Sequence, residues 1–133
     1  TVGLWFTIRE DIADKVRKAG LDFGGGLHGL EHAMIAGVPY HLLCDRWDMG
    51  GLSATFHVDT LQPTIFLYDG YEGGIGICER IYDMFEEVLS FTLDLVRHCG
   101  CDSGCPACIY SPKCGNENRP LDKAACLEIL KSF

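Results

Sequence analysis

Cys99-Gly-Cys101-Asp-Ser-Gly-Cys105-Pro-Ala-Cys108-Ile-Tyr-Ser-Pro-Lys-Cys114 is the stretch that decides how this chain folds. Five of the eight cysteines lie within these sixteen residues. Cys105-Pro-Ala-Cys108 is a C-x-x-C knuckle, a turn in which two thiolates converge on one metal ion. Zinc takes four such ligands in a tetrahedron in closed structural sites. The stretch therefore predicts a four-cysteine zinc site.

Five clustered cysteines compete for four positions around the ion. Cys105 and Cys108 are paired by the knuckle, and Cys101 and Cys114 can both reach back to the same ion. We therefore predict Zn²⁺ bound by Cys101, Cys105, Cys108 and Cys114, with Cys99 as a spare that could replace Cys101. Four thiolates leave no position for water, so the predicted zinc is structural, and no catalytic residue is expected.

Disulfide bonds are the alternative use of eight cysteines. Against them, the cysteines are clustered, no signal peptide is visible, and the rest of the sequence can form a core unaided. We therefore favour metal over a disulfide-stapled interaction domain. Thiolate ligands in turn indicate a reducing, cytoplasmic setting.

Length and charge limit the classes of function. The 133 residues predict one domain, 1–133, with the zinc knuckle at 98–118. The net charge is −8, and four thiolates with one zinc ion make it about −10. Free-standing nucleic-acid binders are usually basic, so any DNA contact must be local or made by a neighbouring domain. Lys113, Arg119 and Lys123 could form a small positive patch for DNA or a partner, or could only offset the zinc–thiolate charge.

Apolar residues alternate at 3–8 and 52–58 and form a continuous run at 64–68, and both patterns predict strands. Residues 3–8 form one strand, 52–58 a second and 64–68 a third, the last two joined as a hairpin. In the second strand, Leu52, Ala54, Phe56 and Val58 share one face, which predicts a half-buried strand.

Helical spacing predicts four helices, at 9–19, 27–36, 77–97 and 121–133. Gly24-Gly-Gly26 is expected to be a flexible break before the second helix. The fold class is therefore α+β: a small, mainly antiparallel sheet of about three strands covered by about four helices, with the zinc knuckle between the last two.

A competing signal is His28-Gly-Leu-Glu31-His32, which matches H-x-x-E-H. In inverted zinc metallopeptidases two such histidines bind zinc and the glutamate acts as general base. No clear third ligand follows on a later helix. Packing or hydrogen bonding within the fold, or a non-proteolytic binding role, are the other interpretations of these residues.

Asp69-Gly-Tyr-Glu-Gly73-Gly74-Ile-Gly76 lies between a predicted strand and a predicted helix, where backbone N–H groups can bind phosphate. The alternative is a tight turn with close backbone packing. No Gly-Lys dipeptide occurs in the chain, so a Walker A loop is absent.

Gly104-Cys-Pro-Ala-Cys-Ile-Tyr-Ser-Pro-Lys-Cys-Gly-Asn116, followed by Asn118-Arg-Pro-Leu-Asp-Lys123, resembles the C-terminal zinc-binding domain of MrfA-type superfamily 2 DEAD/DEAH-box helicases. The segments at 27–33, 44–51 and 68–76 are also similar to segments of that family. The resemblance implies a four-cysteine zinc site, an ATP-dependent parent helicase in DNA repair, and an accessory domain that is not itself an enzyme. The implied partners are helicase core domains of the same polypeptide, with DNA as a further candidate and no membrane.

Overall fold

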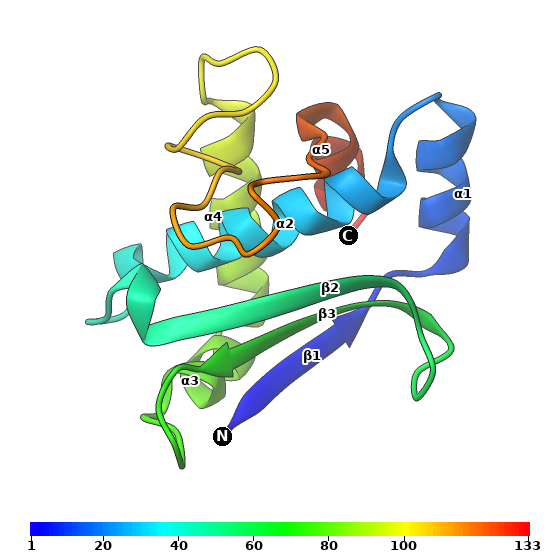
Figure 1. Cartoon of the computed structure of the whole chain (residues 1–133). Helices are drawn as coiled ribbons and strands as arrows, with labels where there is room; N and C mark the ends of the chain where they lie inside the picture. Colours follow the sequence, from blue (N-terminus) through cyan, green and yellow to red (C-terminus); the bar gives the residue numbers. More distant parts are fainter.

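The computed structural model describes residues 1–133, and its centre is a three-stranded antiparallel sheet with helices over one face (Figure 1). The strand order is β1-β3-β2, and the central strand β3 pairs antiparallel with both neighbours. The predicted α+β fold is confirmed. The strands are β1 (Gly3–Thr7), β2 (Met49–His57) and β3 (Gln62–Asp69).

Five helices accompany the sheet, one more than the sequence predicted. Two short 3₁₀ turns, η1 (Val38–Tyr40) and η2 (Arg46–Asp48), precede β2. No helix is long and apolar enough to cross a membrane. The helices are α1 (Glu10–Lys18), α2 (Phe23–Gly37), α3 (Ile77–Asp83), α4 (Phe85–Arg97) and α5 (Lys123–Lys131).

The central helix, α2, begins earlier than predicted and runs through the three glycines that we expected to be a flexible break. The Asp22 side chain caps it by accepting a hydrogen bond from the Gly25 N–H at 3.0 Å. A Cβ on Gly26 would lie 2.5 Å from the Ala125 Cβ of α5. The glycines therefore let the backbones of α2 and α5 approach closely, and this packing offsets their poor helix propensity.

The prediction of a single helix at 77–97 is wrong. Residues 77–97 form two helices, α3 and α4, that meet at Met84, where φ is −123° and ψ is 33°. No glycine or proline marks the break. Its cause is tertiary, because α3 packs against β1 and β3 whereas α4 packs against α2 and α5. One straight helix could not lie against both surfaces.

The alternation in β2 is present, but its apolar side faces away from the helices. Leu52 is 56% exposed and Phe56 60%. Gly51 faces the other way, since a Cβ there would lie 2.8 Å from Cγ of Glu31 on α2. The expectation that Leu52 and Phe56 are on the buried side is therefore wrong. The reason is that α2 lies so close to β2 that only small side chains fit between them.

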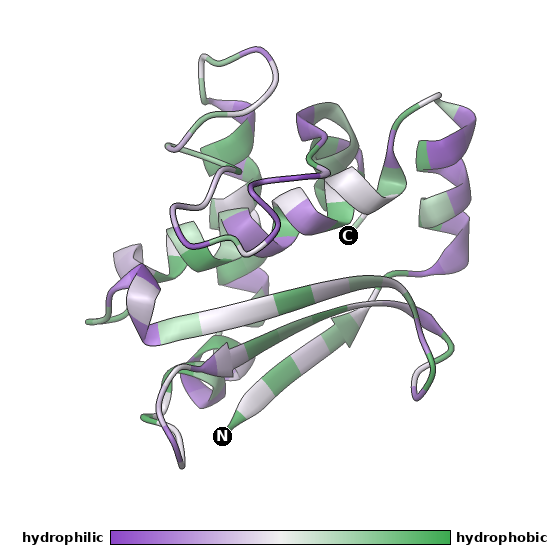
Figure 2. Ribbon diagram, in the orientation of Figure 1, coloured by the Kyte–Doolittle hydropathy of each residue, from purple (hydrophilic) through white to green (hydrophobic).

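The side of the sheet away from α2 therefore carries apolar groups, and we call it the outer sheet face. The strand register aligns Trp5, Phe66 and Leu52 in one row across the three strands, with Tyr68 two residues further along β3. Trp5, Leu52 and Tyr68 are exposed. Figure 2 shows hydrophobic residues on the strands as well as on the helices. The helices cover one side of the sheet and leave this one exposed.

A long irregular segment, residues 98–122, connects α4 to α5 and lies beside α2 (Figure 1). It holds the clustered cysteines between the last two helices, as predicted. Two residues of this segment, Cys108 and Ile109, are buried in the main hydrophobic core. The segment is therefore packed against the domain along part of its length.

Candidate metal centre

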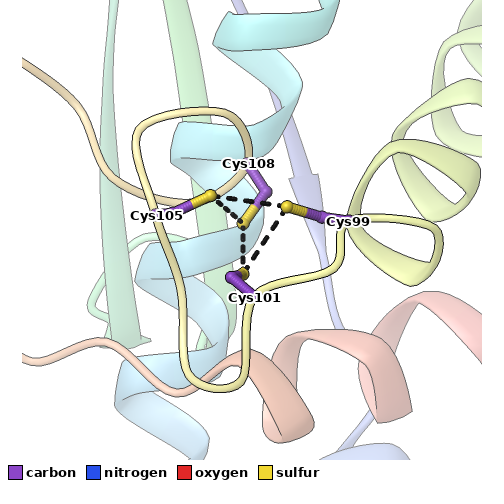
Figure 3. A group of neighbouring side chains, drawn as sticks. All are labelled: Cys99, Cys101, Cys105 and Cys108. Carbon is purple, nitrogen blue, oxygen red and sulfur yellow. Dashed lines mark hydrogen bonds between the residues drawn. The ribbon is translucent and has the colours of Figure 1, made fainter.

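Four cysteine sulfurs lie close enough together to hold one ion, and they belong to Cys99, Cys101, Cys105 and Cys108. The sulfur of Cys99 is 3.5 Å from that of Cys101 and 3.4 Å from that of Cys105. The sulfur of Cys108 is 3.6 Å from that of Cys101 and 3.9 Å from that of Cys105. A zinc–sulfur bond of 2.3 Å with tetrahedral angles requires sulfurs about 3.8 Å apart. Figure 3 shows the four sulfurs pointing toward a common centre.

Local backbone structure places these sulfurs. Cys99 follows directly on the end of α4. The knuckle turn is closed by backbone hydrogen bonds from the N–H groups of Cys108 and Tyr110 to the Cys105 carbonyl, at 3.0 and 3.2 Å. Gly104 has φ +125°, and a Cβ there would lie 2.8 Å from Ile109. Only glycine fits at that point, because both the backbone angle and the space exclude a side chain.

The cluster contains three of the four cysteines predicted as ligands, and Cys99 in place of Cys114. Cys114 lies elsewhere, with its sulfur 3.6 Å from Nε2 of His28. The reason is the path of the chain after Cys108. His32 binds the Ile109 carbonyl and His28 binds the Pro120 carbonyl, both through Nδ1 at 2.7 Å. These contacts draw the segment along α2 and away from the knuckle.

Lys123 supplies positive charge to the cluster. Its ammonium group donates hydrogen bonds to the carbonyls of Cys99 and Cys101, at 3.0 and 2.6 Å, and lies 3.2 Å from the Cys101 sulfur. Partial burial opposes ionisation of Cys101, but Lys123 and the neighbouring thiols lower its pKa to about 6. Burial raises the pKa of Cys108 to about 12.

This donor set fits zinc. Four sulfurs at nearly tetrahedral spacing match a closed structural site. One cationic side chain, that of Lys123, offsets part of the negative charge that four thiolates bring. Bound zinc would keep all four thiols ionised, since a coordinating thiol is deprotonated.

The predicted positive patch beside the knuckle does not form. Lys123 is only 8% exposed. The Lys113 ammonium group donates to the Met49 carbonyl and lies 5.7 Å from the centre of the Trp47 ring. Arg119 alone of the three predicted cations is exposed. Two of the three cations therefore act inside the domain.

The structure does not favour the disulfide alternative. All eight cysteines are free. The shortest sulfur–sulfur distance in the cluster is 3.4 Å, whereas a disulfide bond is about 2.05 Å long.

The H-x-x-E-H residues lie on α2, where all three are almost fully buried. One ring nitrogen of His28, one of His32 and the Cys114 sulfur lie within 4.8 Å of one another. Burial lowers the pKa of His32 to about 4, against the opposing effect of the Ile109 carbonyl. Burial also raises the pKa of Glu31 to about 7, despite a hydrogen bond with Ser53. No later helix brings a ligand to these histidines; the sulfur beside them belongs to Cys114 in the irregular segment.

The loop after β3 is organised by its own carboxylate. Asp69 accepts hydrogen bonds from the N–H groups of Ile75, Gly76 and Ile77 at one oxygen and from that of Cys78 at the other, at 2.8–3.3 Å. These are the donors that a phosphate would need. The tight-turn interpretation therefore accounts for this loop.

The fold and the thiolate cluster together define a class of protein: a small α+β domain built around a cysteine-ligated metal centre. The model of the family described as "MrfA Zn-binding domain" matches residues 30–109. The chain belongs to this family of zinc-binding domains.

In its relatives the domain is either nearly the whole protein or a small part of a helicase. The chain is 39% identical to the uncharacterized protein MJ1572.1 of Methanocaldococcus jannaschii over 110 residues, which are 80% of this chain and 98% of that protein. It is 36% identical to the uncharacterized ATP-dependent helicase YprA of Bacillus subtilis over 112 residues, covering 82% of this chain but 14% of the helicase.

A crystal structure of the DUF1998 helicase MrfA bound to DNA shares the fold, with a TM-score of 0.71 and 29% identity. The match covers 97% of this chain and 16% of MrfA. The chain therefore spans about a seventh of the length of the helicases it matches. The metallopeptidase alternative receives no support from the family or from these relatives.

Proposed function

We propose that this domain is a structural zinc module of an ATP-dependent DNA helicase. In this proposal Cys99, Cys101, Cys105 and Cys108 hold the zinc ion, and Cys99 takes the place first given to Cys114. The main support for this ligand set is the nearly tetrahedral spacing of the four sulfurs. The family match supports it, because it ends at residue 109, after Cys108 and before Cys114. Four thiolates fill the coordination sphere, so the zinc stabilises structure and performs no chemistry.

Zinc-edge X-ray absorption on the Cys114→Ser variant tests this ligand set. We expect four sulfur neighbours at about 2.3 Å, as in a closed four-cysteine site. The Cys99→Ser variant should lose one sulfur neighbour or the ion itself, and Cys44→Ser is the control, since Cys44 lies outside the cluster. A spectrum that loses sulfur in Cys114→Ser and stays intact in Cys99→Ser would restore the set predicted from sequence.

The second part of the proposal concerns the partner. Helicase core domains of the same polypeptide would cover the outer sheet face, since the helicase relatives continue for more than five times the length of this domain. The exposed side chains on this face are aromatic or aliphatic. Trp5 and Leu52 lie in one row across the sheet, and Tyr68 lies in the next row. Side chains of this kind commonly form the centre of protein interfaces.

Aspartate substitutions in the full-length helicase polypeptide test this contact. Leu52→Asp should weaken packing of the domain on the core, and hydrogen exchange on β2 should rise while zinc content stays constant. Leu43→Asp is the control, because Leu43 is also an exposed leucine, more exposed than Leu52, but lies outside the strands. Equal exchange on β2 in the two variants would contradict docking through the outer sheet face.

DNA contact, repair and localisation complete the proposal. The net charge of −8 and the internal roles of Lys113 and Lys123 favour weak DNA binding by the isolated domain. Fluorescence anisotropy should give no sub-micromolar affinity for single- or double-stranded DNA at physiological salt; such affinity would contradict the accessory role. The resemblance extends the proposal to DNA repair, tested by survival of cells without the parent gene after DNA damage. Free thiol ligands suit the reducing cytoplasm.

A further inference from the structure

We propose that His28, His32 and Cys114 form a second metal site, separate from the four-cysteine centre and suited to Zn²⁺. The three side chains come from α2 and from the irregular segment that follows the knuckle. Their donor atoms lie within 4.8 Å of one another. Imidazole nitrogen and thiolate sulfur are the donors that zinc prefers, and three protein ligands are the number found at zinc sites with one exchangeable position.

The two imidazole rings are held in the tautomer that a metal ligand requires. Nδ1 of His28 lies 2.7 Å from the Pro120 carbonyl, and Nδ1 of His32 lies 2.7 Å from the Ile109 carbonyl. A carbonyl oxygen can only accept, so each Nδ1 carries the proton and donates it. Nε2 of each neutral ring then keeps its lone pair. An Nδ1–H bonded to a backbone carbonyl is the usual second-shell arrangement of zinc-bound histidine.

The thiol is placed to complete the set. The Cys114 sulfur lies 3.6 Å from Nε2 of His28. Zinc–nitrogen and zinc–sulfur bonds of ordinary length, at a tetrahedral angle, place the two donor atoms about 3.6 Å apart. The backbone N–H of Asn116 also donates to this sulfur at 3.4 Å. This contact fixes the position of the sulfur beside the His28 ring.

The site opens on a surface groove lined by α2, β2 and residues 111–120 of the irregular segment. This groove has a volume of about 550 Å³ and is lined by the three proposed ligands together with Glu31, Ser53 and Lys113. The fourth tetrahedral position would be taken from this side by water or by a small ligand in the groove. This exposure distinguishes the second site from the four-cysteine centre, which its own thiolates fill.

The alternative is that the histidines have a purely structural role and bind no metal. In that role the two rings only clamp the segment through the Pro120 and Ile109 carbonyls, and the Cys114 thiol donates a weak hydrogen bond to His28. The clamp requires Nδ1 of each ring but neither metal nor thiolate. The two roles therefore differ in the number of zinc ions that the chain binds.

Native mass spectrometry of the zinc-saturated 133-residue chain separates the two roles. We expect two zinc ions in the unsubstituted protein and one in Cys114→Ser and in His32→Gln. Cys44→Ser and His57→Gln are the matched controls and should keep both ions, since neither residue belongs to a cluster. Circular dichroism of each variant confirms that it is folded.

Cobalt substitution supplies a second readout if His32→Gln does not fold. Sulfur-to-cobalt charge transfer in Cys114→Ser should fall by the part due to one of five cobalt–sulfur bonds, with the four-cysteine spectrum retained. A single zinc ion that persists in Cys114→Ser and in His32→Gln would overturn the second site. Two ions that both persist in Cys114→Ser and His32→Gln would overturn it equally. Loss of zinc from the four-cysteine centre alone would contradict the proposed function but leave this site standing.

Discussion

Two loops of this domain solve the same problem in different ways. The loop at 69–76 brings several backbone N–H groups to one point, where the Asp69 carboxylate accepts four hydrogen bonds. The segment at 98–122 brings four sulfurs to one point, where the main opposing charge within the chain is the ammonium group of Lys123. The first loop contains its own counter-charge, whereas the second depends on a cation from solution.

The two loops should therefore differ in whether they fold without metal. A buried carboxylate paired with backbone donors is satisfied within the chain, so the loop at 69–76 should be ordered whenever the sheet is. Metal binding and local folding share one free energy in a thiolate site. Order in the segment at 98–122 should therefore follow zinc occupancy.

Removing zinc should have the largest effect. Apparent zinc-binding free energies in small cysteine and histidine sites are roughly 10–16 kcal/mol, so chelation should unfold residues 99–110 locally. Hydrogen exchange with mass spectrometry should show rapid exchange there and continued protection at Cys78, next to the Asp69 carboxylate. Equal loss of protection in both loops would contradict the contrast.

Replacing the carboxylate is the reverse experiment. Asp69→Ala leaves four N–H groups without their acceptor at a residue that is 1% exposed. We expect the free energy of unfolding to fall by about 3–4 kcal/mol, measured by urea denaturation, with zinc content unchanged. Asp69→Asn keeps one acceptor oxygen and should lose less. Loss of zinc in either variant would show that the two loops are not independent.

Lys123→Met tests the internal cation of the cysteine segment. It removes the hydrogen bonds to the carbonyls of Cys99 and Cys101 and the positive charge beside the Cys101 sulfur. Zinc affinity should fall about 10–100-fold, the usual cost of losing a second-shell contact. Competition with a chromophoric chelator measures this, and the exposed Lys131→Met, on the same helix, is the control. Equal affinities in the two variants would exclude a role for Lys123 at the metal.

Lowering the pH should protonate Asp69 and modestly reduce the free energy of unfolding. Burial alone would raise the pKa of this carboxyl, but its backbone hydrogen bonds hold the pKa below the ordinary value of 3.8. A lowered pKa in the folded state means that the stabilisation is complete above about pH 4 and is lost as pH falls through the folded pKa. The stability difference between the unsubstituted protein and Asp69→Asn should therefore shrink as the pH falls below about 4. A difference independent of pH would show that the charge of Asp69 contributes nothing.

Much of the fold could be predicted from sequence because it depends on local pattern. Alternation in 52–58, the continuous apolar run at 64–68 and the periodicity of the helices identified the sheet and the helices that cover it. The predictions that were wrong depend on contacts between distant residues. Gly26 is helical because Ala125 lies against it, and the helix at 77–97 breaks at Met84 because its halves pack on different elements.

The cysteine site shows the same limit. Spacing along the chain placed Cys101, Cys105 and Cys108 together, as the structure does. Spacing left Cys99 as a spare that could replace Cys101, and it did not indicate that Cys114 lies apart from the other three sulfurs. Cys114 lies apart because His28 and His32 hold the segment against α2 through backbone carbonyls. Nothing in the sequence near Cys114 signals those contacts.

The close packing of α2 on α5 also determines when the domain can be completed during synthesis. Gly26 and Ala125 touch in the folded domain but are about 100 residues apart in the chain. At roughly 5–20 residues per second, α2 would emerge from a ribosome several seconds before the helix that covers it. During that interval the sheet can form against α2, while the surface meant for α5 stays exposed. This domain should therefore reach its native state only after the last helix has been made.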